Sequence, residues 1–185
     1  AQGTENRRSV GSRPHQPPGA WGQLGHGGKE KVLLPKRVEA LAGTHAVAVS
    51  AGSAYSLVLS AAGQVYSFGA GRRGQLGYAT DEQLVPRLVD ALCGVRIAAI
   101  CAGSAHSLAV TEAGELYSFG EEGQGQLGRG DDEDSEPKLV EVLQGEHVVT
   151  VAAGYRHSLC VVESGRVFGW GAGCNVRGMV ARIRL

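Results

Sequence analysis

The sequence Ala51-Gly-Ser-Ala-Tyr-Ser-Leu57 identifies a structural repeat, because it returns twice at a fixed spacing. It recurs as Ala102-Gly-Ser-Ala-His-Ser-Leu108 and as Ala153-Gly-Tyr-Arg-His-Ser-Leu159, 51 residues further along each time. Two other stretches keep the same phase. Gly63-Gln-Val-Tyr-Ser-Phe-Gly69 has counterparts at 114–120 and 165–171, and Gly-Gln-Leu-Gly stands at 22–25, 74–77 and 125–128. A fixed period of this length indicates one structural unit copied along the chain.

Each copy predicts short β-strands and no long helix. The runs 47–50, 97–100 and 148–151 are β-prone, and each ends at Ala-Gly. The run 56–59 leads through Ala61-Ala62-Gly63 into 65–68, a hairpin in which glycine takes a turn geometry that a Cβ would resist. A fourth short strand is expected near 86–89 and 137–140, with proline at its start or on a sheet edge. Four short strands in about 50 residues are typical of a β-propeller blade.

The recurring stretches resemble the repeats of the regulator-of-chromosome-condensation family. The shared pattern is A-G-x-x-H-S-L, then G-x-V-Y-S-F-G, then G-Q-L-G, and it covers roughly residues 20 to 175. Members of that family form seven-bladed propellers. The resemblance therefore implies an all-β, incomplete propeller of about three four-stranded blades out of an expected seven. The expected repeat units lie near 20–50, 51–101, 102–152 and 153–179. The glycines that recur in these copies form a structural signature: Gly52, Gly63, Gly69, Gly74, Gly77, Gly103, Gly114, Gly120, Gly125, Gly128, Gly154, Gly165 and Gly171.

The two ends of the chain depart from the repeat. Residues 1–19 hold Arg7, Arg8 and Arg13 among Gly, Ser, Gln and Pro, which predicts a disordered basic tail. Val176-Arg-Gly-Met179 stands where a further Gly-Gln-Leu-Gly would belong, and the alternating residues 180–185 predict a C-terminal tail or an edge strand. An arc of three blades would leave two apolar blade faces open, at a loss on the order of 10 kcal/mol if each shows about four large side chains.

Composition excludes several classes of function. Lys plus Arg and Asp plus Glu number 18 each, so no global field attracts nucleic acid or an anionic membrane. No apolar run approaches the roughly 20 residues of a membrane span, so we expect an intracellular protein, cytoplasmic and/or nuclear, with no membrane partner. The four cysteines fit neither a zinc site nor a disulfide framework. Cys101 and Cys160 take the repeat positions of small core residues.

Three sequence patterns resemble phosphate-binding or catalytic motifs, but each lacks a feature that the motif requires. Gly69-Ala-Gly-Arg-Arg-Gly74 matches a phosphate-binding loop, but no helical pattern follows it and its next copy carries two glutamates. His106 and His157 share a repeat position with Tyr55, an exchange that a metal ligand or general base would not tolerate. The recurring serines lie in no G-x-S-x-G elbow. We therefore predict no catalytic residue, no cofactor and no metal.

Two charged loops are the candidate partner-binding sites. Asp131, Asp132, Glu133 and Asp134 open an acidic run that the preceding copy lacks. It is either a solvated loop or a contact for a basic partner surface, since propellers bind through loops on their faces. Arg72 and Arg73 form a weaker case, opposite Gly123-Gln124 of the next copy.

The predicted function is a non-catalytic protein-interaction module within a larger scaffold or regulatory protein. The alternative, implied by the resemblance, is guanine-nucleotide exchange on a Ran-type small GTPase. The family's exchange factor uses a wedge inserted in one blade, and the near-constant repeat length here leaves no room for one. No segment resembles a HECT ligase domain, and two tryptophans are too few for the ultraviolet-B receptor branch. Protein partners are expected, a small GTPase in the alternative, whereas nucleic acid or chromatin binding is not expected from this segment.

Overall fold

The chain folds into antiparallel β-sheets in the computed structural model, which describes residues 21–130 and 136–173. The first sheet has the order β1 (Ala46–Ala51), β2 (Tyr55–Ser60), β3 (Val65–Ala70), β4 (Glu82–Leu88). The second has β5 (Ile97–Ala102), β6 (His106–Thr111), β7 (Leu116–Gly120), β8 (Lys138–Leu139), and the third has β9 (Val148–Ala153), β10 (His157–Val162), β11 (Val167–Gly171). Short 3-10 helices η1 (Glu39–Leu41), η2 (Asp90–Leu92) and η3 (Glu141–Leu143) precede the first strand of each sheet.

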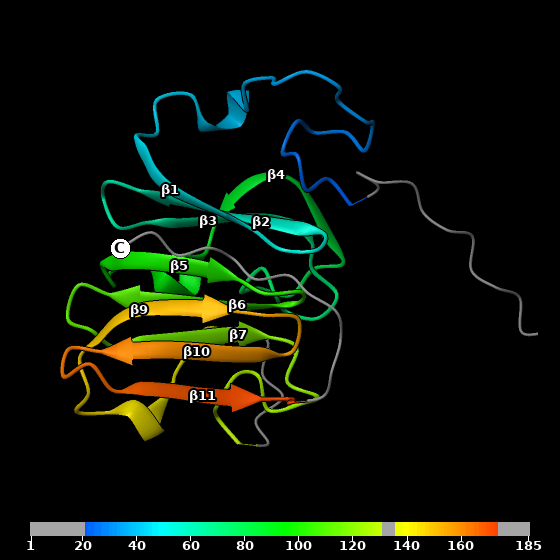
Figure 1. Cartoon of the computed structure of the whole chain (residues 1–185). Coiled ribbons are helices and arrows are strands. Elements are labelled where there is room, and N and C mark those ends of the chain that lie inside the picture. The colour runs from blue at the N-terminus through cyan, green and yellow to red at the C-terminus, as the bar shows by residue number, and fades with distance from the viewer. Residues whose placement is uncertain (1–20, 131–135, 174–185) are drawn as a thin grey trace, which may run out of the picture.

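The three sheets lie side by side in chain order, as blades of a propeller do (Figure 1). We call them the first, second and third blades. The leading strands β1, β5 and β9 contact one another in sequence, and β2 and β6 contact the leading strand of the following blade. The result is an open arc of about three blades, as the sequence predicts, with the chain passing from each blade to the next.

The predicted strands are confirmed in position and pairing. The 56–59 and 65–68 runs pair as β2 and β3 with Leu57 opposite Ser67, and the corresponding pair in the second blade is Leu108 and Ser118. The fourth strand also forms in two blades, and Pro86 lies in β4, an edge strand that pairs only with β3. The described residues supply three strands to the third sheet, and the residues that follow β11 from 174 on lie outside the described part of the chain. The predicted N-terminal tail (1–19) and C-terminal segment (180–185) lie outside the described residues.

Apolar side chains hold neighbouring blades together. Leu59 and Val65 of the first blade pack with Ala109 and Phe119 of the second. Between the second and third blades, Leu108, Val110 and Leu116 pack with residues of β9 and β10. Cys101 and Cys160 are buried in this second interface, which confirms the small core role predicted for them. Because each interface buries several large aliphatic side chains, hydrophobic burial is the main force that joins the blades.

Among the described residues, no other blade packs against the two outer faces of the arc. Leu57 and Leu108 have no exposed surface, whereas Leu159, at the same position in the third blade, is 41% exposed. On the opposite face Val49 is 76% exposed, while Val151, its counterpart in the third blade, is buried. The difference comes from the neighbour and not from the residue, since a blade face is buried only where another blade packs against it.

Buried serines fix the Gly-Gln-Leu-Gly turns to the sheets. Within a blade, the Ser67 and Ser118 hydroxyls donate to the carbonyls of Leu76 and Leu127 at 2.7 and 2.8 Å. Across blades, the Ser107 and Ser158 hydroxyls donate to the carbonyls of the adjacent glutamines, Gln75 and Gln126, each at 2.8 Å. Ser56 binds the Gln23 carbonyl in the same way at 2.8 Å. The turn of one blade is thereby hydrogen-bonded to the next blade, which makes it part of the interface.

His106 forms a second polar link between blades. Its Nε2 lies 3.0 Å from the hydroxyl oxygen of Ser158, which donates its own proton to the Gln126 carbonyl. His106 therefore donates from Nε2, and its buried Nδ1 has no hydrogen-bond partner. Gly103 leaves the room for this ring, because a Cβ there would lie 2.2 Å from His106 Cε1. Tyr55 takes the same position in the first blade and donates to the carbonyl of His106.

Protonation of His106 in acid should lower the free energy of unfolding. Burial lowers the pKa of its imidazole to about 4, with a further lowering from His157, because protonation would place a charge in the interface. The unfolded chain takes up this proton near pH 6.5, so stability is retained above that pH and is lost as the pH falls from 6.5 to about 4. The expected loss is about 3 kcal/mol of unfolding free energy.

Urea denaturation at several pH values measures this loss. His106→Gln should flatten the stability profile between pH 6.5 and 4, whereas His157→Gln, which alters an exposed ring, should leave most of it. An unchanged profile in His106→Gln would show that other groups cause the acid sensitivity.

Candidate functional site

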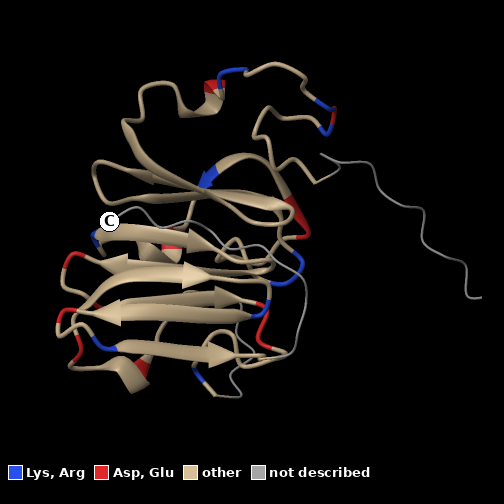
Figure 2. Ribbon diagram, in the orientation of Figure 1, with Lys and Arg blue, Asp and Glu red and all other residues tan. Residues whose placement is uncertain are grey.

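A groove of about 690 Å³ opens at the end of the blades where the long β3–β4 and β7–β8 connections lie. We call this the loop end, and the opposite end, with the β2–β3 and β6–β7 hairpins, the turn end. One wall of the groove is formed by residues 72–74 of the first blade, and the other by residues 120–125 and Gly130 of the second. Most charged residues gather at the ends of strands, and the middles of the sheets carry few (Figure 2).

The two walls are built by the same kind of turn, one copy in each blade. In the first blade Gly74 N–H donates to the Gly71 carbonyl and Gly77 N–H to the Gly74 carbonyl, each at 2.9 Å. In the second blade Gly125 N–H donates to the Glu122 carbonyl at 2.9 Å and Gly128 N–H to the Gly125 carbonyl at 3.2 Å. The buried serines described above tie these turns to the sheets, whereas the side chains of the walls vary between copies.

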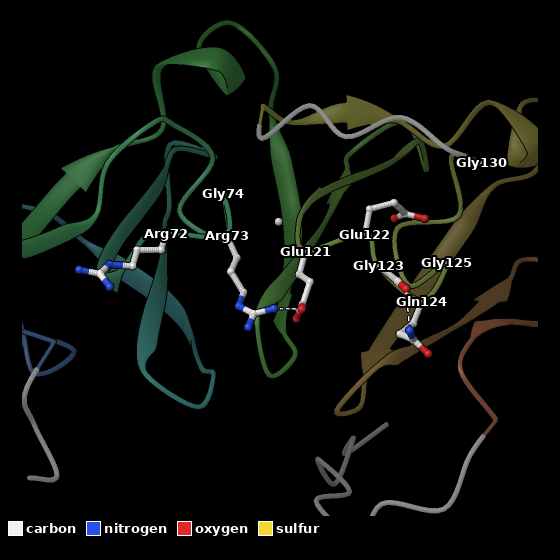
Figure 3. A pocket seen from close by; sticks show the side chains of 10 residues that line it. Arg72, Arg73, Gly74, Glu121, Glu122, Gly123, Gln124, Gly125 and Gly130 are labelled. Atoms are coloured by element: carbon white, nitrogen blue, oxygen red, sulfur yellow. Dashed lines mark hydrogen bonds and ion pairs between the residues drawn. The ribbon is translucent and has the colours of Figure 1, made fainter. Parts of the chain in front are cut away.

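An ion pair spans the groove. Arg73 Nη1 contacts Glu121 Oε1, and the two side chains point toward each other from opposite walls (Figure 3). Arg72 points away from Glu121, its Nη2 lies 3.5 Å from Asp81 Oδ2, and its guanidinium lies over the Trp21 ring at 5.3 Å. Both arginines of the first wall therefore already have an acidic partner within the chain, and both remain more than half exposed.

The second wall presents acidic and amide groups. Glu122 Oε2 accepts the Leu127 N–H at 2.9 Å, which ties this carboxylate to its own turn. Gln124 is exposed, and its backbone N–H donates to Gln126 Oε1 at 2.9 Å. Gly123 and Gly130 have no heavy atom within 4 Å of an added Cβ, so the second wall is open to solvent there. The groove can accept an extended chain more readily than a small molecule enclosed on all sides.

The structure brings two of the predicted partner-binding residues into this groove. Arg72 and Arg73 line it, and Gly130, the residue before Asp131, lies in the opposite wall. The predicted residues Asp131, Asp132, Glu133 and Asp134 lie outside the described residues. The sequence does not single out Glu121 and Glu122 as partner-binding residues, although they are the two glutamates in that copy of the glycine pattern.

The described residues contain no group of three or more His, Cys, Asp or Glu side chains placed to hold a metal ion. The pair of His106 and Ser158 has the spacing of a base and a nucleophile, but both side chains are buried between blades and away from the groove. Within the described part of the chain, no helix has the length and apolar character needed to cross a membrane.

Comparison with known proteins places this geometry in a family. The profile of the regulator of chromosome condensation (RCC1) repeat matches residues 19–59, 62–110 and 113–161, so it covers most of the chain in three successive copies. The chain belongs to the RCC1 repeat family. A second RCC1 repeat profile matches residues 46–75, 97–126 and 148–178, and each of these matches begins at a leading strand of the arc.

Curated relatives with RCC1-like sequence are longer than this chain. It is 41% identical over 161 residues to the E3 ubiquitin-protein ligase HERC2 of Homo sapiens, covering 84% of this chain and 3% of that protein. It is 42% identical over 155 residues to the ultraviolet-B receptor UVR8 of Arabidopsis thaliana, covering 82% of this chain and 35% of the receptor. The chain thus spans a small part of one relative and about a third of the other.

Solved RCC1-type structures show the same fold. Prp20p of Saccharomyces cerevisiae superposes with a TM-score of 0.74 at 25% identity, over 84% of this chain and 40% of Prp20p. Human WBSCR16 superposes with a TM-score of 0.63 at 28% identity, over 74% of this chain and 36% of that structure. The three blades therefore correspond to an arc of an RCC1-type propeller.

Proposed function

We propose that this chain is a non-catalytic protein-interaction module that binds a basic segment of a partner protein in the groove at the loop end. The observation that carries the proposal is the groove itself, whose two walls come from two blades and carry charged side chains that differ between the copies. Glu121 and Glu122 supply carboxylates on the second wall, and the acidic run at 131–134 follows Gly130 directly in the sequence.

Charge favours a basic partner over an acidic one. Arg72 is paired with Asp81 and Arg73 with Glu121, so each of these pairs adds little net potential for a ligand. The loop from 121 to 136 carries seven acidic residues against one arginine, Arg129. Lysine or arginine side chains entering the groove would meet Glu121 and Glu122, and they could displace Arg73 from Glu121.

One relative gives independent support. The structural description of Prp20p names its binding properties to Gsp1p and histones, so an RCC1-type propeller can bind proteins. Guanine-nucleotide exchange on a Ran-type GTPase gains no support from the groove. The similarity to HERC2 gives no support for ligase activity in this chain, because the chain corresponds to 3% of that protein.

Binding of a lysine-rich peptide tests the proposal, measured by fluorescence anisotropy with a glutamate-rich peptide of equal length as the reference. The double variant Glu121→Gln/Glu122→Gln should weaken binding of the lysine-rich peptide by about tenfold. Arg73→Gln should instead strengthen it several-fold, because it frees Glu121 and removes a positive charge.

The matched control is Glu112→Gln/Glu163→Gln, which removes the same charge from exposed positions in the turn-end hairpins. This control should bind as the parent chain does. Equal weakening in both double variants would mean that peptide binding depends on net charge alone. Weaker binding of the lysine-rich peptide by Arg73→Gln would contradict the proposal that the groove prefers a basic ligand.

A further inference from the structure

Four arginines in the described part of the chain lie over an aromatic ring, and three of these also pair with a carboxylate. In these three groups the nitrogen–oxygen distance lies between 2.6 and 3.5 Å. A ring covers one face of the planar guanidinium and leaves its edge for a carboxylate. The three groups are Arg72 over Trp21 with Asp81, Arg87 over Tyr78 with Asp90, and Arg166 over Phe168 with Glu146.

The fourth arginine, Arg156, lacks the carboxylate. Its guanidinium lies 5.4 Å from the centre of the Tyr155 ring. Among residues 21–130 and 136–173, no acidic side chain pairs with Arg156. Tyr155 is 46% exposed and Arg156 is half-buried, so both can be reached from solvent. The ring and the guanidinium are therefore in place, and the acidic member of the group is not supplied by the described chain.

The pair is particular to the third blade. The first two copies of the repeat have Ser-Ala at the same positions, 53–54 and 104–105. The fold does not require tyrosine and arginine there, because the first two blades form this turn without them. Tyrosine and arginine are also enriched among the residues that contribute most to protein–protein binding. The departure from the repeat thus places two residues typical of an interface on an accessible turn.

Hydrogen bonds hold the backbone of this turn at three points. It joins β9 to β10 at the loop end, since His157 is opposite Gly171 at the end of β11 (Figure 1). Gly154 N–H donates to the His157 carbonyl at 2.8 Å, and the Gly154 carbonyl accepts the Ser104 N–H at 3.3 Å. The Arg156 carbonyl accepts the N–H of residue 172 at 2.8 Å. Because the backbone is already bonded, a ligand would have to order little more than the two side chains.

We propose that Tyr155 and Arg156 form a contact site for a carboxylate side chain of a partner protein, with an apolar group of the partner packed on the Tyr155 ring. The partner's carboxylate takes the place that Asp81, Asp90 and Glu146 hold in the other three groups. A single arginine fits a carboxylate better than a phosphate group, whose recognition uses clusters of arginines. The site shares no residue with the groove at the loop end, and it does not depend on a basic ligand there.

Titration of the full chain with acetyl-Phe-Glu-Phe-amide, followed by two-dimensional amide NMR spectra, tests this site. The tripeptide carries one negative charge between two apolar rings. We expect saturable changes in the amide signals of residues 154–157. The neutral peptide acetyl-Phe-Gln-Phe-amide has the same shape, and it should bind about fivefold more weakly because its amide makes no charge-assisted hydrogen bond with the guanidinium.

Two variants remove the site, and a third is the matched control. Tyr155→Ser/Arg156→Ala gives the third blade the residues of the first two, so the fold should be retained. Arg156→Gln keeps the ring and removes the charge. Both variants should bind the two tripeptides equally. Arg166→Gln removes the same charge from an arginine that lies over a ring but is already paired with Glu146, and it should keep the preference for the charged peptide.

Three results would overturn the proposal. The first is a parent chain whose amide signals at 154–157 show no saturable change with the charged peptide. The second is equal affinity of the parent chain for the two tripeptides. The third is a preference for the charged peptide that survives in both variants of Arg156.

The same variants separate this site from the groove. Neither Tyr155 nor Arg156 lines the groove, so Tyr155→Ser/Arg156→Ala should bind the lysine-rich peptide as the parent chain does. Loss of the tripeptide preference with unchanged binding of the lysine-rich peptide is the expected result. A failure of the lysine-rich peptide to bind would count against the groove alone, because the tripeptide titration reports on different residues.

Discussion

Leu108→Ala is expected to reduce the unfolding free energy by about 2–5 kcal/mol, because it removes a large side chain from the closed interface between the second and third blades. Leu108 has no exposed surface and packs among the residues of that interface. The surrounding strands belong to two sheets whose pairing fixes their positions, so they can close the cavity only in part. Urea denaturation of the monomeric chain at low concentration measures the effect.

Leu159→Ala is the matched control for this substitution. It makes the same chemical change at the same position of the repeat, on a face that is 41% exposed in the single chain. We expect a loss below about 1 kcal/mol, because less apolar surface returns to water. Equal losses for the two variants would show that the third blade is covered as completely as the second, and the open arc would then be wrong.

Gly120→Ala should destabilise the fold by more than about 3 kcal/mol through the backbone alone. Gly120 ends β7 with a φ of +113°, and an added Cβ would lie 2.5 Å from the carbonyl oxygen of Ala105 and 2.8 Å from the Cα of His106. Neither contact can relax by rotating a side chain, since both atoms belong to the neighbouring backbone. Thermal unfolding followed by circular dichroism reports the loss.

The control for this change lies three residues away. An added Cβ at Gly123 would meet no heavy atom within 4 Å, and the φ of Gly123 lies outside the positive range. Gly123→Ala should therefore be neutral, or stabilising by about 0.4–1 kcal/mol through the loss of freedom in the unfolded chain. Destabilisation of similar size in both variants would contradict the backbone argument.

The repeat period predicts the strands but not the burial of each strand. The hairpins around Gly63 and Gly114 follow from local signals, namely β-prone runs joined by a glycine turn. Leu108 and Leu159 stand in nearly identical sequences, yet one is buried and the other is exposed. Their difference depends on whether another blade lies alongside, and the residues near them in the sequence contain no information about that.

The candidate groove was only partly predictable for a related reason. Arg72 and Arg73 stand out in the sequence because the next copy has Gly123-Gln124 at those positions. Glu121 becomes prominent only when the arc places it across from Arg73, 48 residues earlier in the chain. The serines at 67, 107, 118 and 158 recur plainly, but their role as donors to the turn carbonyls depends on the distance between strands and turns of different blades.

Hydrogen–deuterium exchange with and without the lysine-rich peptide tests whether the loop-end groove binds a basic protein segment. We expect slower exchange at residues 72–74 and 120–125 when the peptide is bound, with no change in the turn-end hairpins at 61–64 and 112–115. Slower exchange confined to the turn end, or none at the groove under saturating peptide, would contradict it.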